Sequence, residues 1–459
     1  MNIRKIVFFI IAATFFTTIN CFAKDLTFED FTYTVLPDKS TEIIKFTGEY
    51  ENISIPSIIE GHIVTSIGAS AFNHNEKLTS VTIPDSVIYI GDHAFSECTS
   101  LQSVVLPDDL LSLGELVFQG DVQLESITLP ATLLHMGMNP FDRCDKLTEI
   151  GISEENNFYS VENGVLYDKR GNKLITYPAG KQDKKFEVPA WITDIDYAAF
   201  SENNFIEEIT LSESIKTING NPFCGCLSLK SIHISPLNSN YEVYSGALFG
   251  IQNRELIAYL WNSENETYTV PQGTRSIAQE SFYKHKELKS IELPKTVISI
   301  KDAAFAESGL EEIKIPENVI GIGNSAFSNC ADLKSVTLPA GLSWIGNYAF
   351  YECNALAEIS FPKSLSSIGE GAFFHCTGLS ELVFPDSLHY IGNYAFLECT
   401  GIKSIDFSSN LYSIGGGAFY GIEDLTVKAE PGSLGEEWAI QNNVPVEHKN
   451  VEYLPADIA

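Results

Sequence analysis

The chain has 459 residues, of which 44% are hydrophobic and 19% are charged, so it is long enough to bury a large core. Acidic residues outnumber basic residues by 60 to 29, and the formal net charge is −31. This charge argues against binding to nucleic acid or to anionic membranes, because both repel an acidic chain. We expect the acids to keep a strand-rich surface in solution; attraction of basic partners or Ca²⁺ is the alternative.

The N-terminus has the pattern of an export signal. A short basic segment, residues 1–5, precedes an apolar stretch, residues 6–16, that is too short for a stable membrane anchor. Cys21 and Ala23 place small residues three and one positions before a cleavage point, which predicts a signal peptide over residues 1–23. A lipid-modified Cys21 is the alternative. The predicted location is the cell surface or the medium, with the periplasm as an alternative, and no membrane span is expected after signal removal.

Residues 24–52 alternate apolar and polar side chains around Phe31-Thr32-Tyr33-Thr34-Val35. This alternation predicts a β-rich N-terminal cap. A cap is needed because the repeats that follow would otherwise expose their core and an unpaired sheet edge.

A phenylalanine that follows a small residue recurs along the chain, nearly always at intervals of 23 residues. It stands at Phe72, Phe95, Phe118, Phe141, Phe200, Phe223, Phe282, Phe305, Phe327, Phe350, Phe373, Phe396 and Phe419. Each unit also carries Ile-Gly or a related pair before the phenylalanine and, after it, an alternating segment; in Val81-Thr82-Ile83 this segment ends at Pro84. The alternation predicts a short half-buried strand, and proline ends it because it has no N–H to donate. We expect Gly68 and its equivalents to supply turns with unusual backbone angles.

Each repeat has one apolar side that it cannot bury alone, so the repeats must stack into a solenoid. Stacked strands form a parallel sheet with roughly 4.8 Å between coils. Each buried phenylalanine contributes on the order of 1.5–3 kcal/mol, so the phenylalanine column dominates the predicted stability.

The pattern F-x-x-C/N-x-x-L-x-x-I-x-L-P-x-x-L-x-x-I-G-x-x-A covers about residues 53–425. It resembles the BspA-like leucine-rich repeats, also called the Treponema pallidum type. The resemblance implies a repeat solenoid, namely a right-handed curved leucine-rich-repeat superhelix with a parallel β-sheet on one face, and frequent placement on microbial surfaces. Some relatives are adhesins, which implies a protein partner such as a host matrix protein or a microbial surface protein.

Two intervals between repeat phenylalanines, 141–200 and 223–282, are both 59 residues long and copy each other. Each contains two apolar–polar alternations around a turn, which predicts β-hairpin insertions near residues 154–185 and 236–267. We interpret them as structural side-wings, and binding projections are the alternative. After the repeats, residues 426–459 are predicted to form a C-terminal cap and tail, with a short helix around Glu436 to Ile440.

Seven cysteines stand three residues after a repeat phenylalanine, where other repeats carry Asn, Asp or Ser. They are Cys98, Cys144, Cys226, Cys330, Cys353, Cys376 and Cys399. Leucine-rich repeats use Asn or Cys at this position to hydrogen-bond the turn of an adjacent coil, so we predict buried, reduced, structural thiols. Oxidation of stacked neighbours is the alternative. Cys224-Gly225-Cys226 is too tight for a metal pair, and no metal site is predicted.

The sequence offers no catalytic constellation. It lacks His-Glu-x-x-His, a phosphate-binding loop and Gly-x-Ser-x-Gly. Paired carboxylates such as Glu207-Glu208 and Glu311-Glu312 lie in strand columns, which is typical of a solvated face rather than of a glycosidase dyad. We therefore predict neither an enzyme nor a bound cofactor.

Two surfaces are candidates for binding. The first is the more variable of the two outward columns of the strand after each phenylalanine: Thr82, Val105, Thr128, His233, Glu292, Lys314, Thr337, Ser360, Val383 and Asp406. Variation on a constant scaffold suits recognition, and a tolerant solvent face is the alternative. The second is an aromatic stripe. Tyr89, Trp344 and Tyr390 stand beside the Ile-Gly turns, Tyr348 and Tyr394 precede the repeat Ala-Phe, and Tyr351, Phe374, Leu397 and Tyr420 follow it. An exposed stripe of this kind indicates an interface, and packing against the neighbouring turn is the alternative.

These observations predict an exported, non-catalytic protein that mediates macromolecular binding, through cell-surface adhesion or protein–protein interaction. A structural or self-assembling component of the cell envelope is the alternative. The sequence predicts neither the ligand nor the oligomeric state.

Overall fold

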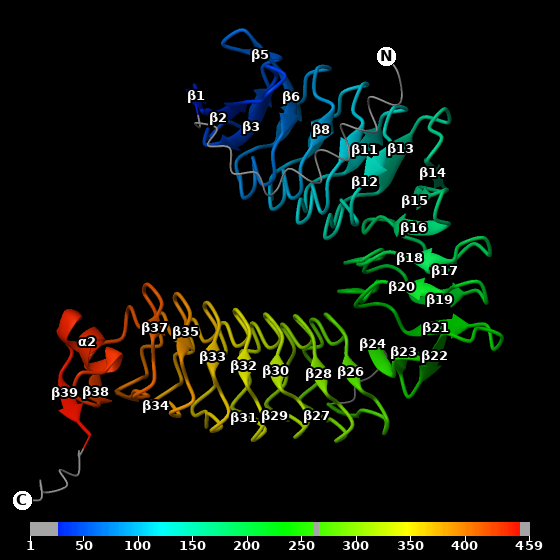
Figure 1. Cartoon of the computed structure of the whole chain (residues 1–459). Coiled ribbons are helices and arrows are strands. Elements are labelled where there is room, and N and C mark those ends of the chain that lie inside the picture. Colours follow the sequence, from blue (N-terminus) through cyan, green and yellow to red (C-terminus); the bar gives the residue numbers. More distant parts are fainter. Residues whose placement is uncertain (1–25, 261–265, 450–459) are drawn as a thin grey trace, which may run out of the picture. The chain divides into compact units, whose positions relative to one another are not determined.

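The computed structural model describes residues 26–260 and 266–449. The predicted signal peptide, Cys21 and residues 450–459 of the predicted tail lie outside these ranges. The described chain forms two compact units, residues 26–141 with 152–156 and residues 142–151 with 157–449. Each unit is a stack of β-coils (Figure 1). Among the described residues, no helix is long and apolar enough to cross a membrane.

Most coils contain two short strands, and equivalent strands of neighbouring coils pair in parallel. In the coil of residues 351–373 an isolated bridge between Ser335 and Glu358 takes the place of the first strand. In unit 1 the first strands are β4 (Asn52–Ser54), β7 (Ser80–Thr82), β9 (Ser103–Val105) and β11 (Ser126–Leu129), and the second strands are β6 (His62–Ile67), β8 (Tyr89–Ile90), β10 (Ser112–Leu113) and β12 (His135–Met136). Pairs such as Val81↔Val104 and Ile67↔Ile90 keep the apolar residues in register inside the coil. The predicted leucine-rich-repeat solenoid with parallel sheets is confirmed.

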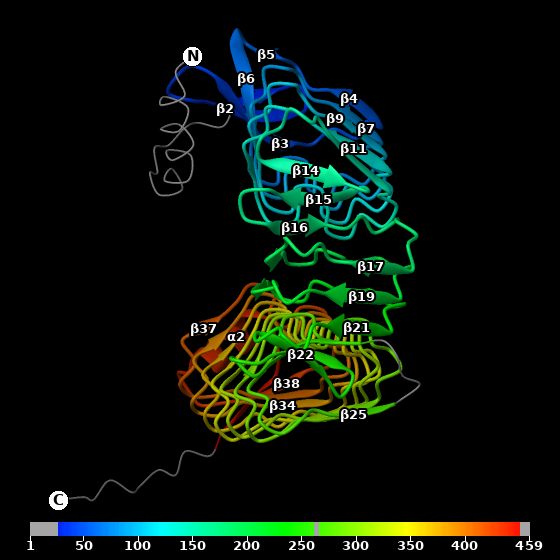
Figure 2. The ribbon, with the colours of Figure 1, turned by 90° about the vertical axis from the view of Figure 1, so that its right-hand side faces the viewer.

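Unit 2 repeats this plan over more coils. Its first strands are β17 (Lys185–Glu187), β19 (Glu208–Leu211), β21 (Ser231–Ile234), β25 (Thr267–Thr269), β27 (Ser290–Glu292), β29 (Glu312–Lys314), β31 (Ser335–Thr337), β34 (Glu381–Val383), β36 (Ser404–Asp406) and β38 (Thr426–Ala429). Its second strands are β18 (Asp194–Ile195), β20 (Thr217–Ile218), β26 (Ser276–Ile277), β28 (Ser299–Ile300), β30 (Gly321–Ile322), β32 (Trp344–Ile345), β33 (Ser367–Ile368), β35 (Tyr390–Ile391) and β37 (Ser413–Ile414). Strand β13 (Glu149–Ile152) precedes them along the chain. Figure 2 shows β17, β19 and β21 stacked as one ladder.

The repeat phenylalanines stack in the core of each unit. In unit 2 the ring centroids of Phe305 and Phe327 are 5.2 Å apart, and those of Phe350 and Phe373 are 5.1 Å apart. The planes of both pairs are within 10° of parallel. The spacing matches the distance between hydrogen-bonded strands, so ring stacking and strand pairing satisfy the same repeat.

The N-terminal segment and both insertions share one fold, a three-stranded antiparallel meander. The three copies are β1 (Leu26–Phe28), β2 (Phe31–Val35) and β3 (Thr41–Phe46); β14 (Tyr159–Glu162), β15 (Val165–Asp168) and β16 (Lys173–Thr176); and β22 (Tyr241–Tyr244), β23 (Ala247–Gly250) and β24 (Glu255–Tyr259). The third strand of each copy pairs in parallel with the second strand of the next coil. Each insertion therefore contains a hairpin, but its last strand belongs to the solenoid and not to a side-wing. In unit 1, β5 (Ile58–Ile59) adds a short hairpin to β6.

Each meander also supplies a ring to the core column. Phe46, Tyr177 and Tyr259 lie three residues after the paired strand position and stack on the next repeat phenylalanine, at 5.1, 5.3 and 5.2 Å. Their N–H groups donate to the carbonyl oxygens of Ala71, Ala199 and Ser281, respectively. Each 59-residue interval thus contains one additional coil of the solenoid. The sequence pattern missed it because the ring is a tyrosine and the interval from the preceding phenylalanine is 36 residues.

The glycines of the Ile-Gly steps serve a different purpose from the one predicted. Gly91, Gly346 and Gly415 are not among the described residues with positive φ. A Cβ atom at Gly415 would lie 2.3 Å from the backbone N of Asn393, and one at Gly91 would lie 2.7 Å from that of Ala69. These glycines are required because the backbones of neighbouring coils touch there. The left-handed angles occur instead two residues before and after the ring, as at Tyr348 and Glu352 around Phe350 (both φ 54°).

The cysteine column is buried, and the described cysteines are free thiols. The Cys353 thiol donates to the carbonyl oxygen of Phe327 in the preceding coil at 3.1 Å. The same bond is made by Cys98, Cys226, Cys330, Cys376 and Cys399. Burial raises the pKa of Cys330 and Cys399 to about 12, so these thiols stay protonated and able to donate.

His285 occupies the cysteine position after Phe282. It hydrogen-bonds the backbone of Tyr259 in the preceding coil, and its ring lies 5.1 Å from that of Tyr259. Burial lowers the pKa of His285 to about 4, so the ring is neutral in the folded chain at pH 7.

The C-terminal end of unit 2 is covered by helix α2 (Leu434–Gln441) and strand β39 (Val446–His448). Ser433 caps the helix by accepting a bond from the N–H of Glu436. The Trp438 ring packs against Phe407 and Phe419 at 5.7 and 5.1 Å, which closes the last coil of the core.

We predict that Gly415→Ala and Gly416→Ala differ sharply although the residues are neighbours. The Cβ atom at residue 415 overlaps backbone atoms, so it should cost about 1–3 kcal/mol in the free energy of unfolding. The Cβ atom at residue 416 meets only the Asn393 side chain, at 3.8 Å, and should change that free energy by less than about 0.5 kcal/mol. Urea unfolding of both variants measures the difference, and equal costs would contradict the close-approach explanation.

We also predict that His285 makes the fold sensitive to acid. A histidine with a pKa near 6.5 when unfolded and about 4 when folded contributes stability above pH 6.5 that is lost as the pH falls towards 4. His285→Cys restores the thiol found in neighbouring coils and removes this titration. Between pH 7.5 and 4.5, the wild type should lose on the order of 2–3 kcal/mol more than the variant. The exposed His233→Ser is the control and should leave the difference unchanged.

Candidate functional site

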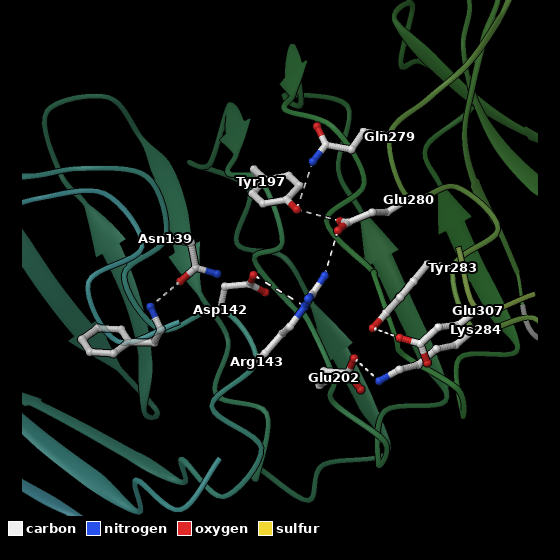
Figure 3. Close-up of polar contacts among 11 residues, drawn as sticks. Asn139, Asp142, Arg143, Tyr197, Glu202, Gln279, Glu280, Tyr283, Lys284 and Glu307 are labelled. Carbon is white, nitrogen blue, oxygen red and sulfur yellow. Dashed lines mark hydrogen bonds and ion pairs between the residues drawn. The ribbon is translucent and has the colours of Figure 1, made fainter. Parts of the chain in front are cut away.

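Ionisable side chains converge in unit 2 at the turns beside residues 143, 202 and 280 (Figure 3). The guanidinium Nη2 of Arg143 lies 2.9 Å from Oε1 of Glu280, and the hydroxyl of Tyr197 donates to Oε2 of Glu280 at 2.7 Å. Lys284 Nζ lies 2.6 Å from Oε1 of Glu202. We call Arg143, Tyr197, Glu202, Glu280 and Lys284 the buried ionic cluster.

The charges of this cluster compensate one another. Burial raises the pKa of Glu280 and of Glu202, while Arg143 and Lys284 oppose that rise. The guanidinium of Arg143 and the ammonium of Lys284 lie 5.2 and 5.0 Å from the ring centroid of Tyr283. Pairing and ring contacts of this kind are what buried charges require.

The cluster exists because the third meander, formed by β22, β23 and β24, shortens the turn of its coil. Phe282 stands five positions after Ile277, but Tyr259 stands only three positions after Leu256. The turns of the flanking coils therefore meet directly, and Asn221 Nδ2 donates to the carbonyl oxygen of Glu280 at 2.9 Å, 59 residues along the chain. Polar side chains occupy the place of the missing turn.

The space beside the cluster is too small for a substrate. The adjoining cavity, lined by Asn221, Phe223, Tyr259, Glu280 and His285 among others, has a volume of about 10 Å³. That is about the volume needed for one water molecule, whereas ligand pockets have volumes of about 300–1,000 Å³. The arrangement therefore joins turns that are distant in sequence and offers no room for chemistry. Sequence reasoning missed it because Arg143 and Glu280 lie 137 residues apart.

The predicted outward column lies on the solvent face of the first strands. Its exposed members are Thr82, Val105, Thr128, His233, Glu292, Lys314, Thr337, Ser360 and Val383. Asp406 is half-buried and lies 2.5 Å from Lys449. The structure brings Glu292, Lys314 and Thr337 side by side on β27, β29 and β31. Thr82 also pairs with Val105 on β7 and β9, and Val383 pairs with Asp406 on β34 and β36. Thr128 and His233 lie on two further sheets, and Ser360 lies outside the strands.

The same sheet carries a shallow hollow of about 520 Å³. It is lined by Glu266, Lys289, Ser290, Glu311, Glu312, Lys334 and Ser335. Lys334 and Glu311 lie 2.5 Å apart at its rim. Alternating charges of both signs suit contact with a polar protein surface, and no three His, Cys, Asp or Glu residues of the described chain are placed to hold a metal ion.

The predicted aromatic stripe divides into two parts. Trp344, Tyr390 and Tyr420 are exposed, with 42%, 38% and 72% of their surface in solvent. Tyr351 and Phe374 are half-buried and stack on each other at 5.0 Å. Tyr348 and Tyr394, which precede the repeat Ala-Phe in the same stripe, are exposed as well. Exposed apolar residues outside the predicted stripe lie nearby: Ile298, Ile320 and Tyr412. The sequence pattern did not single out these three because their column also holds polar residues.

Comparison with protein families identifies the repeats. The BspA-type leucine-rich repeat region, in six copies, matches residues 65–182, 179–253, 258–354 and 320–434. The match confirms the predicted resemblance, and this repeat fold is generally a binding scaffold. No curated protein matches the chain.

Several solved structures are similar. A leucine-rich repeat protein from Bacteroides ovatus is 22% identical, with 93% of this chain and 100% of that chain covered and a TM-score of 0.38. A leucine-rich cell surface protein from Faecalibacterium prausnitzii is 20% identical, with coverage of 93% and 99% and a TM-score of 0.36. The pneumococcal vaccine antigen PcpA is 18% identical, with coverage of 94% and 99% and a TM-score of 0.36.

We predict that the buried ionic cluster stabilises unit 2. Arg143→Met leaves the buried carboxylate of Glu280 without its cation and should cost about 3–5 kcal/mol in the free energy of unfolding. Adding Glu280→Leu should recover only part of this loss: it removes the unpaired Glu280 carboxylate, but the buried Asp142 still lacks its ion pair with Arg143. Lys334→Met removes an exposed pair and serves as the control, with no measurable change expected. Denaturant unfolding tests all three, and an Arg143→Met variant as stable as the control would contradict the proposed role.

Proposed function

Because the chain belongs to the BspA-type leucine-rich repeat family, we propose that it is an exported, non-catalytic protein that binds other proteins at the cell surface. The observation that carries this proposal is the outward column, in which side chains of different chemistry occupy equivalent exposed positions on one scaffold. Thr82, Val105, Glu292 and Lys314 illustrate this variety.

Export is supported by the N-terminal pattern, a basic start followed by a short apolar stretch and small residues before Ala23. The family supports surface placement. Lipid attachment at Cys21 remains the alternative means of anchoring.

The partner is proposed to be a protein, either a host matrix protein or a surface protein of another microbe. The sheet over β27, β29 and β31 is the preferred contact, because charges of both signs lie side by side there. Such a surface sets orientation and specificity through matched charges. The net charge of −31 further favours partners with a basic surface.

The test is saturable binding of residues 24–459 to immobilised collagen, fibronectin and laminin and to intact microbial cells. Reversing the charges with Glu292→Lys and Lys314→Glu should weaken binding at least tenfold and change its salt dependence, because the charges of the two surfaces then no longer match. Both residues are exposed, so these changes leave the core intact. Glu430→Lys, an exposed charge at the start of the C-terminal cap, is the matched control. Surface plasmon resonance measures the affinities.

Binding to none of these surfaces, or equal binding by all variants, would contradict the proposal. Protease treatment of intact cells tests the location separately. A surface protein is degraded, whereas a periplasmic protein is protected until the outer membrane is opened.

A further inference from the structure

Four consecutive coils near the C-terminus alternate between two versions of the second-strand turn. Residues 344–350 read Trp-Ile-Gly-Asn-Tyr-Ala-Phe and residues 390–396 read Tyr-Ile-Gly-Asn-Tyr-Ala-Phe. The coils between and after them read Ser-Ile-Gly-Glu-Gly-Ala-Phe, residues 367–373, and Ser-Ile-Gly-Gly-Gly-Ala-Phe, residues 413–419. A period of two coils is thus superimposed on the period of one coil that builds the solenoid.

The aromatic residues of this pattern form two rows. Strand pairing places Trp344, Ser367, Tyr390 and Ser413 in one register line along β32, β33, β35 and β37. The second line follows four residues later, with Tyr348 and Tyr394 alternating with Gly371 and Gly417. We call Trp344, Tyr348, Tyr390 and Tyr394 the aromatic rows.

Three of the four rings in these rows rest on glycines, and all four remain open to solvent. A Cβ atom at Gly321 would lie 1.9 Å from the indole of Trp344, and one at Gly371 would lie 2.4 Å from the ring of Tyr348. The Tyr394 ring likewise lies 2.8 Å from a Cβ atom placed at Gly417, so three of the four rings cover a glycine of a neighbouring coil, whereas Tyr390 pairs with Ser367. Trp344, Tyr348, Tyr390 and Tyr394 nevertheless expose between 37% and 48% of their surface. Packing thus explains the glycines but leaves the exposed ring surface without a partner.

The rows are spaced regularly. The core rings Phe350, Phe373 and Phe396 advance 5.1 Å at each step, so two coils advance about 10 Å along the stack. Equivalent aromatic rings therefore recur at about this distance. Aromatic rings that recur at a fixed distance suit a ligand that is itself periodic, whereas a globular partner has no such period.

The neighbourhood of the rows is polar but almost uncharged. Residues 343–351, 366–374, 389–397 and 412–420 contain no Lys or Arg, and their single carboxylate, Glu370, accepts a bond from the Tyr348 hydroxyl at 2.6 Å. Asn347 and Asn393 are exposed, and their Oδ1 atoms accept backbone N–H groups of the next coil. Their Nδ2 groups thus supply donors between the two rows. An anionic ligand finds no Lys or Arg in these segments, whose only histidine is His389.

We propose that the aromatic rows bind a neutral, extended polysaccharide of β-1,4-linked hexoses. The apolar face of a pyranose ring stacks on an aromatic ring, and its hydroxyl groups bond to amides and serines at the edge. Alternate sugars of such a chain present the same face, and the two-sugar repeat has nearly the length of two coils. Trp344 and Tyr390 would then stack on every second sugar of the ligand. Tyr348 and Tyr394 would contact the same ligand from the other side.

The test is titration of the full mature chain with cellohexaose and chitohexaose by calorimetry, with the fluorescence of Trp344 as a second readout. We expect saturable binding of at least one hexasaccharide and at least tenfold weaker binding of its disaccharide, which reaches one platform only. The double variants Trp344→Ser/Tyr390→Ser and Tyr348→Gly/Tyr394→Gly should each weaken hexasaccharide binding at least tenfold. They install residues that the intervening coils already carry, so the fold is preserved. Tyr244 is an exposed tyrosine on β22 of the third meander, so the Tyr244→Ser variant is the control and should bind as the wild type does.

Failure of both hexasaccharides to bind the wild-type chain would overturn the proposal, as would double variants that bind like the wild type. If the double variants weaken the binding of a protein partner and no sugar binds to the wild type, the rows are a protein contact and the proposal is wrong. This test is independent of the protein-binding surface proposed on β27, β29 and β31, because Glu292→Lys and Lys314→Glu should leave sugar binding unchanged.

Discussion

The distance between neighbouring coils is the constraint on which the rest of this structure depends. Backbone hydrogen bonds set it near 5 Å, and three columns of side chains conform to it. The phenylalanine rings stack at this distance, the cysteine thiols reach the carbonyl oxygens of the preceding coil, and the glycines let the backbones touch. Since the interior positions are all committed to this spacing, only the outward positions remain free to vary.

The meanders interrupt the 23-residue repeat but keep the same distance between coils. Each one ends in a strand that pairs with the next coil and in a ring, Phe46, Tyr177 or Tyr259, that enters the core column. The second-strand sheet accordingly begins anew at each meander, so that the N-terminal cap and the insertions are one device used three times. In the third copy the shortened turn brings Asn221 to Glu280, and the buried ionic cluster occupies the place left open.

The surfaces follow from the same repeat. Because coils differ in only a few outward side chains, neighbouring residues of one column form a line rather than a pocket. The charged sheet around Glu292 and Lys314 and the aromatic rows around Trp344 and Tyr390 are two such lines with different chemistry. Extended or broad ligands suit lines of this kind better than small molecules do, since a compact ligand needs an enclosed pocket.

The sequence by itself determined the repeat, the parallel strands, the phenylalanine column and the position of the cysteines, because a 23-residue period places equivalent residues in equivalent surroundings. It did not reveal Tyr177 and Tyr259 as core rings, since the meanders break that period and replace the phenylalanine. It assigned Gly415 a wrong role, because the contact between coils is not visible along one chain. Only the tertiary structure decided that Arg143 meets Glu280, that Tyr351 packs while Trp344 stays exposed, and that the rings found at every second coil remain open to solvent. Each of these depends on which turns approach one another in space, and the spacing of residues within one coil does not specify that.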